Sequence, residues 1–156
     1  MSRQRGVVLL ISLMLSLLLA LLAASALHDA LNDTHQAAYL LKGGQAFEQA
    51  EATLLEAASL LPAGMPVCKG CPPPIRPHEL QGRWQPAASG FYQIQNLGTT
   101  ERAMHRPRGE QVTLFRVTAV SAQAQSRQVI EAVYALADGE GEVAQRILWR
   151  QRSKEE

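Results

Sequence analysis

Two cysteines, Cys68 and Cys71, are the side chains whose type and spacing most directly suggest chemistry. A redox site of the thioredoxin kind normally opens a helix after a strand, but here prolines 72–74 follow the second cysteine. A zinc site needs about four ligands, and the isolated histidines do not supply the missing ones: His28, His35, His78 and His105. In an oxidising compartment a local disulfide is the simplest interpretation, and it is the one we favour.

The other polar residues form no recognisable catalytic group. Ser89 has no nucleophile elbow around it, and the chain has no glycine-rich phosphate loop. Glu140 and Glu142 are typical of a solvated turn. The pair His28–Asp29, just after the apolar segment, is typical of polar residues at a membrane interface rather than of a proton relay. The 15 basic and 14 acidic residues are balanced, without the clustered Lys and Arg that nucleic acid binding needs. We therefore predict no enzyme, no metal, no cofactor and no nucleic acid partner.

The element nearest the start of the chain is a segment suited to a membrane. A basic leader, residues 1–6, precedes the uncharged and mostly apolar residues 7–27. A helix of that length spans about 30 Å, which matches the hydrocarbon core of a bilayer. Arg3 and Arg5 before the segment, and acids after it, place the amino end in the cytoplasm. Two alternatives stay open: a secretory signal cleaved after Ala26, and an uncleaved signal anchor.

The helical pattern continues beyond the membrane segment, over residues 28–61. An apolar stripe recurs at steps of three, four or seven residues, which places its members on one helix face. Gly43–Gly44 predicts a bend, and Pro62 predicts the end of the helix. The residues that we expect to take part in helix packing are Phe47, Ala50, Glu51 and Leu54.

The rest of the chain predicts a loop and then a sheet. All prolines except Pro107 lie in residues 62–89, so this interval is expected to be a loop containing both cysteines. Region 90–156 shows alternating and β-branched segments separated by turn residues. These predict about four antiparallel strands, at 90–96, 111–120, 127–136 and 143–152. The expected fold class is α+β: a long N-terminal helix, transmembrane in its first half and amphipathic in its second, packed on a small antiparallel sheet.

Several of these segments resemble a known family. The leader ending in Gly6, with the apolar helix starting at Val7, looks like a type IV pilin precursor. The stretch AFEQAEATL, residues 46–54, resembles the AFQAAE-type stretch on the first helix of the PilX family of type IV pilus assembly proteins. Segments 91–94 and 147–151 are similar to strand segments of the same family. The resemblance thus implies a pilin-like fold.

The resemblance also implies specific processing. A prepilin peptidase would cut after Gly6, and Val7 would become the N-methylated mature N-terminus. Most major pilins have Glu at the fifth mature position, where this chain has Ile11. In a filament that Glu neutralises the N-terminal ammonium of the neighbour nearer the tip, and a buried carboxylate without a partner costs several kcal/mol. A subunit with no neighbour ahead has no use for it, so Ile11 implies a position at or near the tip.

The function implied is that of a minor pilin that helps to initiate pilus assembly. Its expected partners are other minor and major pilins, the prepilin peptidase, the inner-membrane assembly machinery and membrane lipid. It would be anchored in the bacterial inner membrane with a periplasmic C-terminal domain, and would then enter the pilus. One alternative is a single-pass, inner-membrane-anchored periplasmic binding module unrelated to pili. A third hypothesis is a redox protein that uses Cys68 and Cys71.

Overall fold

The computed structural model describes residues 2–61, 64–137 and 143–154, with side chains from residue 7 onward. The chain divides into two compact units, Met1–Leu41 and Lys42–Glu156, which we describe separately. The elements in chain order are the helix α1 (Ser2–Ser59), the short 3-10 helix η1 (Pro77–Glu79), and the strands β1 (Gln85–Ala87), β2 (Gly90–Thr100), β3 (Val112–Ser121), β4 (Val129–Ala137) and β5 (Gln145–Arg152).

The first unit consists of the N-terminal part of α1 alone. Every residue from 7 to 41 is helical and exposed, and residues 7–27 are the apolar segment expected from the sequence. The hydroxyls that interrupt this segment donate hydrogen bonds to carbonyl oxygens one turn earlier, at Ser12, Ser16 and Ser25. A helix whose polar groups are satisfied internally is suited to lipid, and α1 is long and apolar enough to cross a membrane.

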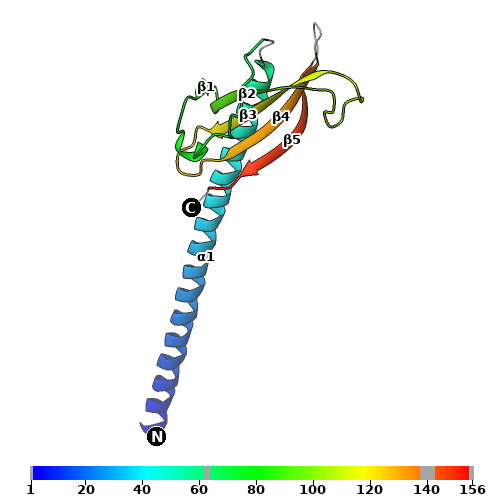
Figure 1. Cartoon of the computed structure of the whole chain (residues 1–156). Coiled ribbons are helices and arrows are strands. Elements are labelled where there is room, and N and C mark those ends of the chain that lie inside the picture. The colour runs from blue at the N-terminus through cyan, green and yellow to red at the C-terminus, as the bar shows by residue number, and fades with distance from the viewer. Residues whose placement is uncertain (1, 62–63, 138–142, 155–156) are drawn as a thin grey trace. The chain divides into compact units, whose positions relative to one another are not determined.

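The second unit is an α+β domain, which confirms the predicted fold class. Its sheet is antiparallel, with the strand order β1-β2-β3-β4-β5 (Figure 1). The described residues form five strands, and the predicted number of about four was wrong because β1 lies in the interval 62–89 that we expected to be all loop. Pro86 lies in the middle of β1 and pairs with Phe91. Proline cannot donate a hydrogen bond to a neighbouring strand, so within sheets it occurs mainly in edge strands such as β1. A short segment centred on proline therefore does not look like a strand in the sequence.

Several element boundaries also differ from those predicted. The helix ends at Ser59 rather than at residue 61, and it is continuous through Gly43–Gly44, where a bend stays a prediction. β2 does not end at residue 96 but continues to Thr100, past a bulge at which the register shifts between Asn96 and Gly98. The φ of Gly98 is +98°, a conformation that glycine adopts freely and that lets the strand continue past the bulge. Pro62 and the predicted turn residues Glu140 and Glu142 lie outside the described residues.

The C-terminal part of α1 packs on one face of the sheet through the predicted stripe. Ala50 and Leu54 of this stripe are fully buried there, and so is Ala57, which was not predicted. Phe47 is partly buried, and its ring meets Trp149 of β5 edge-on at 6.2 Å between centroids. The sheet contributes the buried side chains of Tyr92, Val117, Ala119, Ile130, Ala132 and Tyr134. The small alanine side chains let the helix approach the strands closely along this part of the sheet.

Candidate functional site

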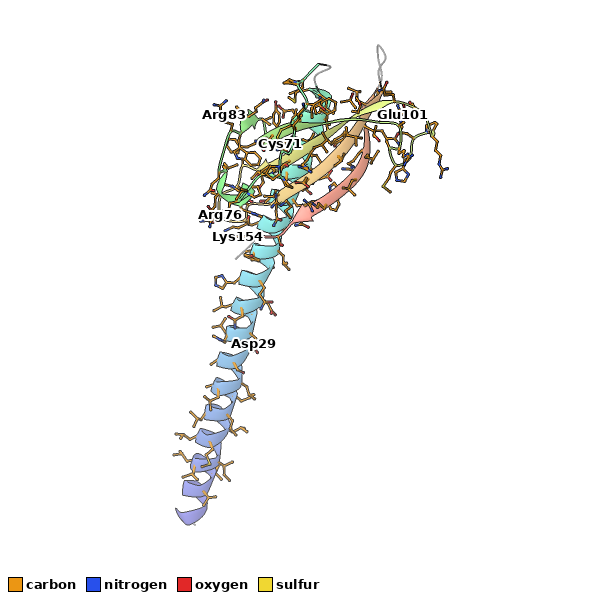
Figure 2. All side chains as sticks on the ribbon, viewed as in Figure 1. Asp29, Cys71, Arg76, Arg83, Glu101 and Lys154 are labelled. Atoms are coloured by element: carbon orange, nitrogen blue, oxygen red, sulfur yellow. A yellow bond between two sulfur atoms is a disulfide. The ribbon has the colours of Figure 1, made fainter. Side chains whose placement is uncertain are left out.

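The loop that contains the cysteines lies on the face of the sheet opposite α1. Successive residues of a strand point to opposite faces, so Arg116 points away from the helix when its neighbour Val117 contributes to the helix-side core. Residues 68–80 cover this outer face, and Figure 2 shows Cys71 over the strands, where its carbonyl accepts from Arg116. We call residues 68–80 the covering loop. Pro74 and Pro77 of this loop are buried, as are Thr118 and Glu131 of the strands.

Cys68 and Cys71 form a disulfide, with 5.6 Å between their Cα atoms. The backbone N–H of Cys68 donates to the carbonyl of Asn96 in β2 at 2.8 Å. The carbonyl of Cys71 accepts a long hydrogen bond, 3.4 Å, from Nη1 of Arg116 in β3. Since the two sulfurs are bonded to each other, neither is a thiolate that could bind zinc in this form. The disulfide therefore closes a short turn that is attached to two strands.

A buried carboxylate, Glu131 of β4, lies below the covering loop. Its side chain is 5% exposed, and Oε1 accepts hydrogen bonds from Arg150 of β5, at 2.6 Å from Nη2 and 2.9 Å from Nε. Arg116 Nε lies 4.0 Å from the same oxygen, and Arg152 Nη1 lies 4.0 Å from Oε2. One carboxylate thus faces three guanidinium groups, and this cluster has an excess of positive charge. Charge-assisted bonds of this kind are among the strongest hydrogen bonds in proteins.

Arginine side chains also hold the main chain of the covering loop. Arg152 donates to the carbonyl of Pro74 at 2.8 Å, and Arg127 donates to that of His78 at 2.7 Å. With the bond from Arg116 to Cys71, three guanidinium groups bind three successive parts of the loop. Glu131 neutralises part of the positive charge of Arg116 and Arg152, two of these three arginines.

The cluster around Glu131 was not predicted from the sequence. A signal existed, because Glu131 is the only charged residue of β4, and a charged residue in an otherwise apolar strand is rarely buried without a partner. The sequence did not indicate which residues pair with Glu131. The pairing depends on the register that places Glu131 opposite Arg150, and that register passes an irregularity between Val133 and Tyr134.

An open groove of about 1060 Å³ lies on the helix side of the sheet, beside the end of α1. Its lining is largely apolar, and Tyr134 is the aromatic residue with a buried hydroxyl there. Burial raises the pKa of Tyr134 above its usual value, and the nearby Arg146 partly opposes this. Leu61, Gly64 and Val143 line the groove and adjoin segments outside the described residues.

The predicted site residues fall into separate parts of the molecule. Val7 and Ile11 are exposed on the first unit, whereas the side-chain description does not include Gly6 or the rest of the leader. Glu51 is not part of the apolar contact: it forms an ion pair with Arg146 at 3.4 Å. Over the described ranges 2–61, 64–137 and 143–154, no three His, Cys, Asp or Glu side chains gather as a metal site would require.

Comparisons of the chain with protein-family models, with curated proteins and with solved structures found no match.

Proposed function

We propose that this protein is a minor pilin of a type IV pilus that helps to initiate assembly and is located at or near the pilus tip. The observation that carries the proposal is the change in character along α1. Its exposed apolar residues 7–27 begin directly after Gly6, and the same helix then buries Ala50, Leu54 and Ala57 against a sheet. A subunit that leaves the membrane for a helical filament core needs both properties in one helix.

The apolar segment gives the proposed assembly step a simple energetic basis. In the inner membrane, residues 7–27 would be surrounded by lipid chains, and in the filament they would be surrounded by the same segments of other subunits. Both environments are apolar, so the transfer changes little hydrophobic free energy, and packing between helices decides it. The hydroxyls of Ser12, Ser16 and Ser25 already donate within the helix, so they need no partner in either place.

The tip location rests on Ile11. The prepilin peptidase would cleave between Gly6 and Val7 and the new N-terminus would be methylated, which makes Ile11 the fifth mature residue. An apolar residue there provides no carboxylate for the ammonium of a neighbour ahead. A subunit with an apolar residue at this position is best placed at the tip end of the filament, where no subunit lies closer to the tip. There it would contact other minor pilins, with the major pilins on the side facing the membrane.

A second candidate function is that of a periplasmic binding module anchored by a single helix. The open groove beside the end of α1 favours it, because a largely apolar hollow of about 1060 Å³ has room for a ligand. In this case residues 7–27 would serve only as an anchor.

The mature N-terminus distinguishes these functions. Mass spectrometry of the membrane and pilus fractions should find a chain that begins at methylated Val7. Gly6→Leu should block the cut and leave an intact precursor in the membrane, because the peptidase is expected to need a small residue there. Gln4→Leu, within the leader but away from the cut, is the matched control and should be processed normally. An N-terminus at Leu27 would indicate a secretory signal, and an uncut wild-type chain would favour the anchored binding module.

A further inference from the structure

The outer edge of β5 has no strand partner within the described residues. β5 is last in the strand order and pairs only with β4. Most of its eight residues are exposed. Alternate residues of an edge strand direct their backbone N–H and C=O groups away from the sheet, and these groups can pair with a further strand.

The opposite edge of the sheet is unsuited to such pairing. β1 has three residues, and its central residue, Pro86, has no N–H to donate. Short edge strands that contain proline are a common protection against unwanted pairing. The sheet can therefore be extended at β5 and is blocked at β1.

The charge of β5 indicates what kind of strand could pair with it. Arg146, Arg150 and Arg152 are its charged residues, and it contains no acidic residue. The Arg150 side chain is 53% exposed although it binds Glu131, and Arg146 is 42% exposed although it pairs with Glu51. Because three guanidinium groups share the carboxylate of Glu131, the cluster keeps an excess of positive charge, and two of the three, Arg150 and Arg152, belong to β5.

A second copy of β5 is a poor partner for this edge. Two such strands side by side would bring both sets of arginines together with no acid on either strand, and like charges on paired strands are destabilising. An acidic strand would have the opposite effect, since carboxylates on its outer face would meet the exposed part of Arg150.

We propose that the outer edge of β5, residues 145–152, binds an acidic extended segment of a partner protein, which adds a strand to the sheet. Acidic side chains of that segment would lie on the face shared with Arg150 and Arg152, and apolar side chains would lie next to Trp149. Backbone hydrogen bonds would supply affinity and the arginines would select the charge. The inference does not depend on a role in pili, because it uses only the sheet edge of the second unit.

The test uses the full-length protein in a zwitterionic detergent. The probe is a synthetic peptide of alternating Glu and Val with blocked ends, and the readout is amide hydrogen exchange followed by mass spectrometry. We expect the peptide to slow exchange in residues 145–152. Two control peptides should not do so: one with Lys in place of Glu, and one with alternate backbone nitrogens methylated, which keeps the charge but prevents strand pairing.

A pair of protein variants tests the role of the arginines. Arg150→Gln should weaken binding of the acidic peptide about fivefold, since it removes one partly exposed ion pair. Arg83→Gln, at an exposed arginine outside the sheet, should leave binding unchanged. Protection by the Lys or the methylated peptide, or no protection of β5 by the acidic one, would overturn the proposal. Protection that rises with protein concentration in the absence of peptide would assign the edge to a second copy instead.

Discussion

Gly90, the first residue of β2, lies so close to Thr53 of α1 that a Cβ atom added at position 90 would come within 2.8 Å of Thr53 Oγ1. The same atom would also collide with the backbone carbonyl of Val120 in β3. Thr53 and Gly90 are both buried. The helix and the sheet therefore meet at a point where only glycine fits.

Gly90→Ala should destabilise the second unit by about 1–3 kcal/mol, because a methyl group forced into a closed contact must push the helix or a strand aside. Thermal unfolding of the full chain in detergent, followed by near-ultraviolet circular dichroism, measures this. Gly43→Ala is the matched control, since no neighbouring atom lies within 4 Å of the added Cβ. It should leave the domain as stable or raise the stability of α1 by up to about 1 kcal/mol. Equal stability of Gly90→Ala and wild type would contradict the close contact.

Glu131→Gln should loosen the covering loop as well as the sheet. The neutral amide has nearly the same shape, but it leaves the guanidinium groups of Arg116, Arg150 and Arg152 facing one another without a counter-charge. We expect a loss of about 2 kcal/mol in urea unfolding, together with faster amide exchange in residues 68–80. Glu110→Gln removes a carboxylate that is more exposed than Glu131 and pairs with Arg106; it should cost less than about 1 kcal/mol. Unchanged exchange in the loop would show that the charge cluster does not hold it.

Stability should fall in alkaline solution because of Tyr134. Burial raises the pKa of its hydroxyl, so the unfolded chain loses this proton at a lower pH than the folded chain does. The contribution of Tyr134 is complete below its unfolded pKa of about 10 and is lost as the pH rises towards the folded pKa. Tyr134→Phe should reduce this slope, because it removes the hydroxyl that titrates. Tyr39→Phe, at an exposed position, should keep the slope; an unchanged slope in Tyr134→Phe would assign the alkaline loss to other groups.

The proposed tip location makes position 11 a sensitive site. Ile11→Glu would place a carboxylate in an apolar helix bundle with no ammonium opposite, which favours protonation of the side chain or retention in the membrane. Assembly should then be impaired or unchanged, and never improved. Counts of filaments by electron microscopy measure this, with Ile11→Leu as the apolar control.

Deletion of the protein should likewise reduce the number of filaments far more than their length. Labelling of isolated filaments should mark their ends, whereas uniform decoration along the shaft would contradict a tip subunit and leave Ile11 unexplained.

The sequence was sufficient to predict those parts of the fold that depend on hydrophobic periodicity. Ala50 and Leu54 are buried where the helical stripe placed them, because a repeat of three and four residues determines one face of a helix. β1 was missed because Pro86 is typical of a loop unless a partner strand is known. The surroundings of Glu131 depend on which residues of β3 and β5 lie beside it, and that is a property of register rather than of local sequence.

The covering loop is held mainly by its backbone, and this has a consequence for how the protein can change over evolutionary time. Arg116, Arg127 and Arg152 bind the carbonyl oxygens of Cys71, Pro74 and His78. Every amino acid presents a carbonyl oxygen, so exchanging the exposed side chains of the loop leaves these three bonds available. Related chains are thus free to diversify the outer surface of the domain while the sheet, the arginines and Glu131 stay the same, and selection can act on that surface without loss of the fold.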